Sequence, residues 1–190
     1  INKVIFISTC SNYGLIEKNE KADENYTLNP LSSYAKHKVE LEKYIMSLEG
    51  QVDYNPTILR FATAFGVSPR MRFDLTINEF TRDLYLKKNL EIYDANTWRP
   101  YCHVNDFSQI IDKIFNSKKE KTSFQIFNAG GDKNNSTKLE IIKKLEKYFP
   151  KSKITFKDKG VDPRNYRVDF SKIKDALNFE PTYTIEDGIK

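Results

Sequence analysis

Two apolar runs on either side of a long helical stretch constrain the fold of this chain most strongly. The first run is Val4-Ile5-Phe6-Ile7, and the second is Thr57-Ile58-Leu59-Arg60-Phe61-Ala62. We expect a strand at residues 3–9, a helix at residues 31–49 and a strand at residues 57–62. Strand, long helix and strand in this order are typical of a right-handed parallel crossover. The first part of the chain is therefore predicted to be α/β.

The rest of the sequence has shorter and looser patterns. Residues 67–70 are expected to form a loop, and further helices and short strands follow it. The expected helices cover residues 75–88, 105–117, 137–148 and 171–177, with another from 185, and the expected strands cover 90–93, 101–103, 124–128 and 153–156. We expect one domain at residues 1–66 and a second mainly at 67–190, with some segments returning to the first.

Composition excludes several classes of protein. The chain has 190 residues, enough to bury one good core, and its apolar runs fall short of the roughly 18 residues that a membrane span needs. Cys10 and Cys102 stand alone, without a CxxC or a His/Cys cluster. We therefore expect reduced thiols, a cytoplasmic protein and no metal site.

The charge pattern favours a small anionic partner over a nucleic acid. The formal net charge is +5, which attracts anions. The basic residues are mixed with acidic ones, however, as where Lys119 and Lys121 flank Glu120. Such mixed runs are typical of solvated helix faces. We therefore expect a phosphorylated metabolite as partner, with no nucleic acid and no membrane.

A tyrosine and a lysine stand four residues apart in the predicted helix at 31–49. Tyr34 and Lys38 are therefore neighbours on one helical face. The same spacing continues through Leu41, Ile45 and Leu48, which predicts that this face is buried. An ammonium close to a phenol favours the phenolate, which can exchange a proton with a substrate hydroxyl. The pair indicates acid–base chemistry on an alcohol.

Hydroxyl side chains follow the first predicted strand. Ser8, Thr9 and Ser11 lie at the carboxyl end of that strand, where open α/β sheets bind ligands. Such hydroxyls also satisfy loop backbone groups, and alone they would favour that structural interpretation. Together with Tyr34 and Lys38 they favour a ligand site.

Four stretches resemble the extended short-chain dehydrogenase/reductase family, in its branch of nucleotide-sugar epimerases and dehydratases. Residues 7–14 (ISTCSNYG) are similar to the family's Ser/Thr segment, and residues 34–38 (YAKHK) to its Tyr-x-x-x-Lys. Residues 59–66 (LRFATAFG) followed by 68–70 (SPR) resemble its strand and substrate loop, and residues 99–106 (RPYCHVND) its Arg-x-[Phe/Tyr]-x-His-Val-x-Asp. The resemblance implies an α/β fold, namely the C-terminal part of a Rossmann-like doubly wound parallel sheet with a smaller α/β substrate-binding domain.

The resemblance also implies a role for each matching residue. Tyr34 would be the general acid/base, Lys38 would hold the nicotinamide ribose, and Thr9 would bond the reacting sugar hydroxyl or carbonyl. Hydride would move to or from NAD while the phenol moves the proton; NADP is not excluded, and no metal is implied. The expected cofactor contacts are Ser8, Tyr34, Lys38, Phe61 and Ala62, and the expected substrate contacts are Thr9, Thr63, Asp74, Leu75, Ile92, Tyr93, Arg99 and Arg164.

Three of these assignments have alternatives. Arg99 would bind the substrate pyrophosphate as a bidentate donor, or else form a surface salt bridge. The stretch DPRNYRVD at 162–169 resembles another substrate-side segment, in which either Arg164 or Arg167 offers a second charge. Trp98 would line the sugar pocket or simply pack beside Arg99.

The sequence departs from the family pattern in two respects. The chain lacks a Gly-x-x-Gly-x-x-Gly or Gly-x-Gly-x-x-Gly loop for the cofactor phosphates. In the family that loop precedes the segment that begins at Ile1, so we expect a fragment that binds NAD poorly. Nucleotide-sugar 4,6-dehydratases carry Asp-Glu directly after the catalytic Thr, whereas this chain has Cys10-Ser11. A dehydratase is therefore disfavoured.

Our leading hypothesis is an NAD-dependent epimerase of a UDP- or GDP-sugar, which oxidises and re-reduces a sugar carbinol. The alternatives are a nucleotide-sugar dehydrogenase or an NADPH-dependent 4-ketoreductase. A hypothesis of another class is a cofactor-free fragment that only binds a nucleotide sugar or another anion. The resemblance further implies a homodimer of the intact enzyme, paired through the Tyr-x-x-x-Lys helix.

Overall fold

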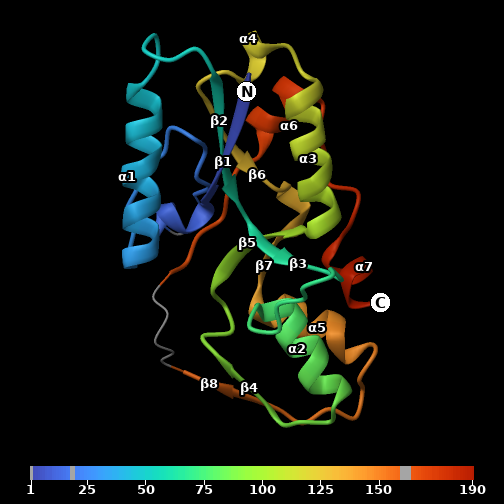
Figure 1. Cartoon of the computed structure of the whole chain (residues 1–190). Coiled ribbons are helices and arrows are strands. Elements are labelled where there is room, and N and C mark those ends of the chain that lie inside the picture. Colours follow the sequence, from blue (N-terminus) through green and yellow to red (C-terminus); the bar gives the residue numbers. More distant parts are fainter. Residues whose placement is uncertain (1, 18–19, 159–163) are drawn as a thin grey trace.

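A three-stranded parallel sheet forms the upper part of the molecule in Figure 1. The computed structural model describes residues 2–17, 20–158 and 164–190. Strand β2 (Asn55–Phe61) lies between β1 (Lys3–Thr9) and β6 (Gln125–Ala129), parallel to both. Its register pairs Thr9 with Phe61, so β1 and β2 end at the same edge. The predicted parallel crossover is confirmed, with helix α1 (Ser33–Ser47) as its connection.

Helices cover both faces of this sheet. Helix α1 lies on one side, and α3 (Val104–Asn116) and α6 (Ser171–Leu177) lie on the other, as Figure 1 shows. Since β2 is paired on both edges, its five central residues are buried, whereas the edge strand β1 is buried only at Ser8 and Thr9. Leu59, Phe127 and Ile110 join one apolar core on the α3 side. The candidate site lies at the carboxyl ends of the strands of this covered sheet.

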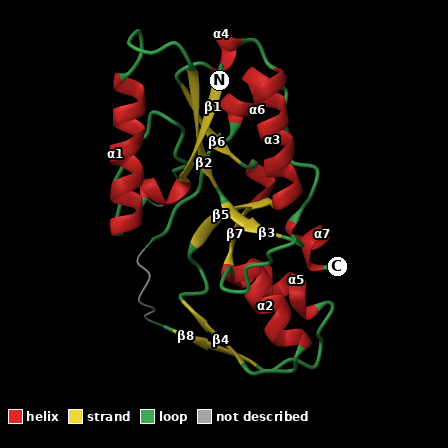
Figure 2. Ribbon diagram, viewed as in Figure 1, coloured by secondary structure: helices red, strands yellow, loops and turns green. Residues whose placement is uncertain are grey.

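The lower part is made of short elements. Figure 2 shows β3 (Thr63–Phe65), β5 (Trp98–His103) and β7 (Asn135–Thr137) between the upper sheet and a pair of helices, α2 (Thr76–Tyr85) and α5 (Lys138–Glu146). Below them β4 (Leu90–Tyr93) pairs in parallel with β8 (Ile154–Lys157). The remaining elements are α4 (Lys119–Thr122), α7 (Ile185–Ile189) and the 3₁₀ turns η1 (Cys10–Tyr13) and η2 (Asp132–Asn134).

Strands β3 and β7 and helix α4 were not predicted, because three or four residues carry too little periodicity to identify an element. The expected strand at 101–103 is longer in the structure and begins at Trp98. Strand β6 and helices α3 and α6 return to the upper sheet from the later part of the chain. The predicted division of the chain into one domain at 1–66 and a second mainly at 67–190 remains a prediction.

The prediction that the face of α1 with Tyr34 and Leu41 is buried is wrong. The side chain of Tyr34 is 57% exposed and that of Leu41 is 45% exposed. The buried residues are instead Ala35, Val39 and Glu42. The spacing of Tyr34 and Leu41 correctly marks a common face, but the small side chain of Ala35 and the carboxylate of Glu42 allow the adjacent face to pack on β1.

The segment at 165–168 lies alongside the loop that follows η1 and runs parallel to it. Leu15 forms a parallel bridge with Asn165, and Ala22 forms one with Val168. The backbone N–H of Tyr166 donates to the Trp98 carbonyl at 3.2 Å. These bonds bring a segment from the end of the chain to the carboxyl edge of the upper sheet.

Candidate active site

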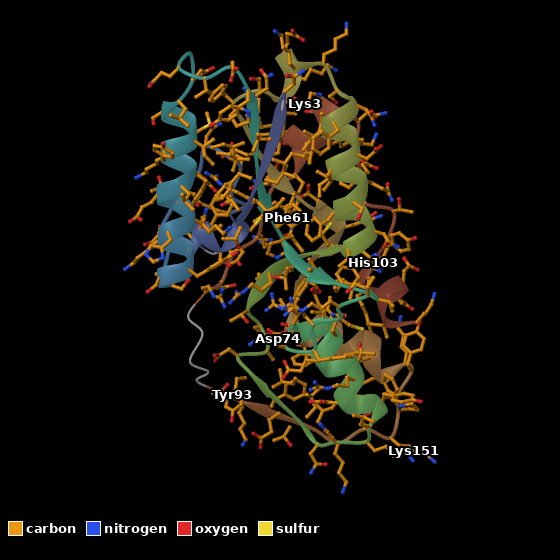
Figure 3. All side chains as sticks on the ribbon, viewed as in Figure 1. Lys3, Phe61, Asp74, Tyr93, His103 and Lys151 are labelled. Atoms are coloured by element: carbon orange, nitrogen blue, oxygen red, sulfur yellow. The ribbon has the colours of Figure 1, made fainter. Side chains whose placement is uncertain are left out.

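A cleft opens at the carboxyl edge of the parallel strands. It has a volume of about 610 Å³, and Figure 3 shows Phe61 above it on β2 and Asp74 below it, just before the start of α2. The lining residues are Ile7, Ser8, Thr9, Ser11, Tyr34, Phe61, Ala62, Thr63, Ala64, Arg72, Asp74, Leu75, Thr76, Arg99, Lys138, Arg164 and Tyr166. Residues from both parts of the chain therefore meet at the position where open α/β sheets bind ligands.

Thr9 and Tyr34 reach this cleft from neighbouring elements. Thr9 is the last residue of β1 and the N-cap of η1, and its hydroxyl accepts a bond from the Ser11 N–H at 3.1 Å. Tyr34 lies in the first turn of α1, where Ser32 caps the helix by accepting from the Ala35 N–H at 3.2 Å. The strand end and the first helical turn thus bring the Thr9 hydroxyl and the Tyr34 phenol to the same cleft.

Lys38 ties α1 to the end of β1. Its ammonium donates to the Ile7 carbonyl at 2.6 Å and lies 5.8 Å from the centre of the Tyr34 ring. It also lies 4.6 Å from the centre of the Phe6 ring. The predicted Tyr34–Lys38 pair is therefore brought together beside the strand end, although on a side of the helix that is not buried.

A buried ion pair supports this wall of the cleft. Arg60 of β2 and Glu42 of α1 are joined at 2.7 Å, and each side chain is only 3% exposed. The hydroxyl of Ser8 donates to Glu42, and so does Asn12 Nδ2 at 2.8 Å. Burial lowers the pKa of Arg60, but its hydrogen bonds and electrostatic interactions with Glu42 and Tyr13 together outweigh burial and hold this pKa above its ordinary value. The pair thus fixes β1, β2 and α1 to one another close to Thr9.

The sequence interpretation missed this ion pair. Glu42 stands four residues after Lys38, which repeats the spacing of Tyr34 and Lys38. The available signal was a pair of charges in two elements expected to pack together, namely a glutamate in the helix and an arginine in the central strand.

Arg99 and Arg164 approach the cleft from β5 and from the late segment. The Arg99 side chain, in a residue only 8% exposed, donates to the carbonyls of Trp98 and Arg164 and stacks 4.9 Å from the ring centre of Tyr166. Arg164 donates to Ser11 Oγ at 3.2 Å. Arg99 is thus buried against the cleft and not on an open surface, and its role toward a ligand stays a prediction.

Arg167 and Trp98 lie in a different pocket. The Arg167 guanidinium stacks 5.1 Å from the Trp98 ring, and both line a cavity with Glu17 and Asn165. Between the two late arginines, Arg164 is therefore the one that lines the cleft with Thr9. Asp162 and Pro163 of the same stretch lie outside the described residues.

The other expected substrate contacts divide into two groups. Thr63, Asp74 and Leu75 line the cleft. Ile92 is only 1% exposed and packs in the lower core, and Tyr93 lies on β4 with 40% exposure. The structure does not bring these last two side chains into the cleft, and their contact with a substrate remains a prediction.

The structure adds cleft residues that the sequence interpretation did not assign to a ligand. They are Ile7, Ala64, Arg72, Thr76, Lys138 and Tyr166. Arg72 bonds Asp74 at 2.5 Å in an exposed pair and lowers the pKa of that carboxyl. Helix α2 begins at Thr76 without a side-chain cap, and Leu75 and Thr76 at this helix N-terminus line the cleft.

Two further features are absent from the part of the chain that the structure describes. Within residues 2–17, 20–158 and 164–190, no three His, Cys, Asp or Glu side chains gather where they could hold a metal ion. In the same ranges, no helix has the length and apolar character needed to cross a membrane.

Comparisons with a family model and with known proteins agree on one family. Residues 1–130 match the sequence model of the NAD dependent epimerase/dehydratase family. The chain is 30% identical over its whole length to an uncharacterized UDP-glucose epimerase of Bacillus subtilis, of which it covers 58%. It is 28% identical to a UDP-glucuronate 4-epimerase of Thermodesulfobacterium geofontis, again covering 58% of that protein.

Solved structures confirm the predicted fold class. UDP-glucuronic acid 4-epimerase from Bacillus cereus, in complex with UDP-glucuronic acid and NAD, matches with a TM-score of 0.86 and 28% identity over 98% of this chain and 59% of that one. The dTDP-glucose 4,6-dehydratase of Bacillus anthracis, in complex with NAD, matches with a TM-score of 0.85 and 25% identity over 98% of this chain and 59% of that one. The chain therefore spans less than two thirds of the length of these relatives.

Proposed function

The chain belongs to the NAD dependent epimerase/dehydratase family, and we propose that it carries the acid–base and substrate-binding groups of an NAD-dependent nucleotide-sugar epimerase. The observation that carries the proposal is the common cleft of Thr9, Tyr34 and Arg99. An alcohol-oxidising site needs a proton acceptor and a hydroxyl partner, and a nucleotide sugar needs a cation for its diphosphate. Residues of all three kinds line this one cleft.

In this proposal Tyr34 takes the proton from a sugar carbinol and later returns it. Thr9 bonds the same oxygen, and Lys38 holds its charge beside the Tyr34 ring, 5.8 Å from the ring centre. Thr9 is buried and is the N-cap of η1, so its hydroxyl is held in one position by the bond from the Ser11 N–H. Oxidation and re-reduction at one carbon need no further acid in the cleft, and Cys10 and Ser11 supply none.

A nicotinamide cofactor would supply the hydride acceptor when bound. Ser8, Phe61 and Ala62 line the wall that Tyr34 shares, and these residues with Lys38 would hold its nicotinamide end. They fit that group because the strand ends offer an open edge with an ammonium beside it. Nicotinamide cofactors, NAD or NADPH, are present in structures of proteins with this fold.

Two features would hold the diphosphate. Arg99 offers a planar guanidinium, which matches phosphate oxygens in pairs. The uncapped N-terminus of α2 adds backbone N–H groups and the positive end of a helix dipole. Both line the same cleft as Thr9 and Tyr34.

Three further proposals concern the protein as a whole. Leu41 and Tyr44 are exposed on α1, which supports a homodimer paired through this helix; light scattering of the purified protein tests it. Both free cysteines are buried, which is compatible with a cytoplasmic location. A dehydrogenase or a 4-ketoreductase would use the same residues, and their products distinguish them from an epimerase.

The test uses the 190-residue chain with a UDP-sugar and a large excess of NAD, because the sequence predicts weak NAD binding, and product is followed by NMR of the sugar carbons. Epimerised sugar is expected, and Tyr34→Phe should lower the rate by about 10²–10⁴-fold without loss of UDP-sugar binding. The matched control is Tyr85→Phe, which makes the same change at an exposed position of α2 that does not line the cleft, and should leave the rate unchanged. Binding without turnover would support the cofactor-free alternative, and oxidised or reduced sugar would support the other two enzymes.

A further inference from the structure

One of the two histidines of the chain, His103, lies at the contact between the upper and lower parts (Figure 3) and has no role in the proposed acid–base chemistry. It is the last residue of β5 and is only 7% exposed. Its ring centre is 4.3 Å from that of Tyr183 and 5.3 Å from that of Phe65. Gly66 lies against the ring edge, because a Cβ added to this glycine would come within 2.1 Å of His103 Nε2. The ring therefore cannot move toward Gly66 without displacing it.

The hydrogen bond at Nδ1 of His103 requires a neutral ring. Nδ1 accepts from the Asn105 N–H at 3.2 Å, which makes His103 the N-cap of α3. Since an accepting nitrogen carries no proton, the proton of this neutral imidazole is on Nε2. A second proton would turn Nδ1 into a donor that faces another donor, and it would place a positive charge at the positive end of the α3 dipole. Protonation therefore drives the ring out of its present position.

Two carboxylates act on this ring, and both already accept other hydrogen bonds. Asp106 of α3 accepts from two backbone N–H groups at 182–183, and Asp187 of α7 accepts from the N–H and the hydroxyl of Thr184. The other neighbours of the ring named above bring one further titratable group, a phenol. Burial lowers the pKa of His103, and the two carboxylates oppose this only in part. The ring is thus neutral above its ordinary titration range and takes up a proton in acid.

A single side chain connects Gly66 to the cleft. The Gly66 N–H donates to Asn78 Oδ1 at 3.1 Å, and Asn78 Nδ2 donates to the Arg72 carbonyl at 3.0 Å. Asn78 is only 5% exposed, so one buried amide holds the loop after β3 at two points. The side chains of Arg72 and Asp74, in the same loop, line the cleft. A displacement of Gly66 by the His103 ring is therefore passed to the cleft through Asn78.

We propose that His103 is a proton-operated switch for the loop at 66–75, and that its protonation releases this loop and weakens the binding of a ligand in the cleft. This inference rests on the proposed function and adds a regulation of the same site. The neutral ring holds the loop in its binding position through Gly66 and Asn78. Because coupling between two sites is reciprocal, a bound ligand must in turn disfavour the protonated ring.

The experiment measures the affinity of the 190-residue chain for UDP-glucose by titration calorimetry, at about pH 7.5 and about pH 5.5, which bracket the ordinary histidine pKa. UDP-glucose is a suitable probe because its diphosphate keeps the same charge over this range. The wild type is expected to bind about fivefold more weakly, or weaker still, at the lower pH. His103→Gln takes up no proton and should bind equally at both pH values. The matched control is His37→Gln, at an exposed position of α1 outside the cleft lining, which should keep the wild-type dependence.

Asn78→Ala provides a second variant in case His103→Gln fails to fold, as judged by circular dichroism. It removes both bonds that connect Gly66 to Arg72, so it should bind UDP-glucose weakly and to the same degree at the two pH values. Proton NMR of the imidazole rings gives an independent readout. Saturating UDP-glucose should move the titration of the His103 ring to lower pH, with the His37 ring as internal control.

Equal affinity of the wild type at the two pH values would overturn this inference and leave the proposed function standing. The wild-type pH dependence in His103→Gln or in Asn78→Ala would overturn it in the same way. Loss of the wild-type circular dichroism spectrum at the lower pH would also overturn it, because the weaker binding would then come from unfolding of the whole chain. Absence of UDP-glucose binding at both pH values would overturn the proposed function and the inference with it.

Discussion

The two walls of the cleft are held in contrasting ways. The wall of β1 and α1 depends on the Glu42–Arg60 pair, whose side chains are 3% exposed. The opposite wall carries the Arg72–Asp74 pair, whose side chains are 62% and 64% exposed. A buried pair fixes its elements because neither charge can be left alone, whereas an exposed pair is screened by water. Thr9 and Tyr34 thus lie on a rigid frame, and the loop at 66–75 has an adjustable one.

The largest expected effect comes from breaking the buried pair. Glu42→Ala leaves the Arg60 guanidinium buried without its carboxylate and removes the acceptor of Ser8 and Asn12. We expect the free energy of unfolding in urea to fall by about 3–5 kcal/mol. The double variant Glu42→Leu with Arg60→Met should lose less than Glu42→Ala, because no charge is then left buried. Equal stability of Glu42→Ala and wild type would contradict the proposed contrast between the walls.

A smaller effect on folding stability is expected when the pH is lowered, because of His103 at the contact between the upper and lower parts. His103 Nδ1 accepts from the Asn105 N–H and caps α3, and its ring stacks 4.3 Å from that of Tyr183. Burial lowers the pKa of His103, and the charges of Asp106 and Asp187 oppose this only in part. The folded state therefore binds a proton less readily than the unfolded one, so this stability is present above about pH 6.5 and is lost as the pH falls.

The measurement for this prediction is the urea midpoint between about pH 7.5 and pH 5.5, a range that brackets the ordinary histidine pKa. The midpoint should fall toward the acidic end in the wild type, and His103→Gln should reduce that dependence. A midpoint that rises toward low pH, or the same slope in both proteins, would show that His103 does not report on this joint.

The smallest effect is expected at the exposed pair. Asp74→Ala removes the partner of Arg72, but water and salt already screen that pair, so the urea midpoint should stay within experimental error. The affinity for a UDP-sugar should change instead, because both side chains line the cleft. A large loss of stability in Asp74→Ala would show that the two walls are equally rigid.

Local patterns predicted the elements and many of the cleft residues. The strand, helix and strand order led to the β1–β2 crossover, and the Tyr34–Lys38 spacing led to a real pair beside the strand end. Periodicity alone could not decide which face of α1 is buried, because the helix has two candidate faces, and the one with Glu42 packs on β1.

Contacts between distant residues were beyond the reach of sequence patterns. The choice of Arg164 over Arg167 for the cleft depends on the bridges between residues 15–22 and 165–168, which bring one arginine to the cleft and leave the other on Trp98. The contact between the Ser11 and Tyr166 hydroxyls arises in the same way. Each depends on the parallel pairing of two segments far apart in the chain, which no local spacing encodes.

The proposed cleft is tested most directly by a crystal structure of the chain with a bound UDP-sugar. We expect a sugar carbinol oxygen within about 2.6–3.2 Å of both the Tyr34 hydroxyl and Thr9 Oγ, with the diphosphate on Arg99 and the N-terminus of α2. A nucleotide bound outside this cleft, or bound in it with the sugar turned away from Tyr34 and Thr9, would contradict the proposed function.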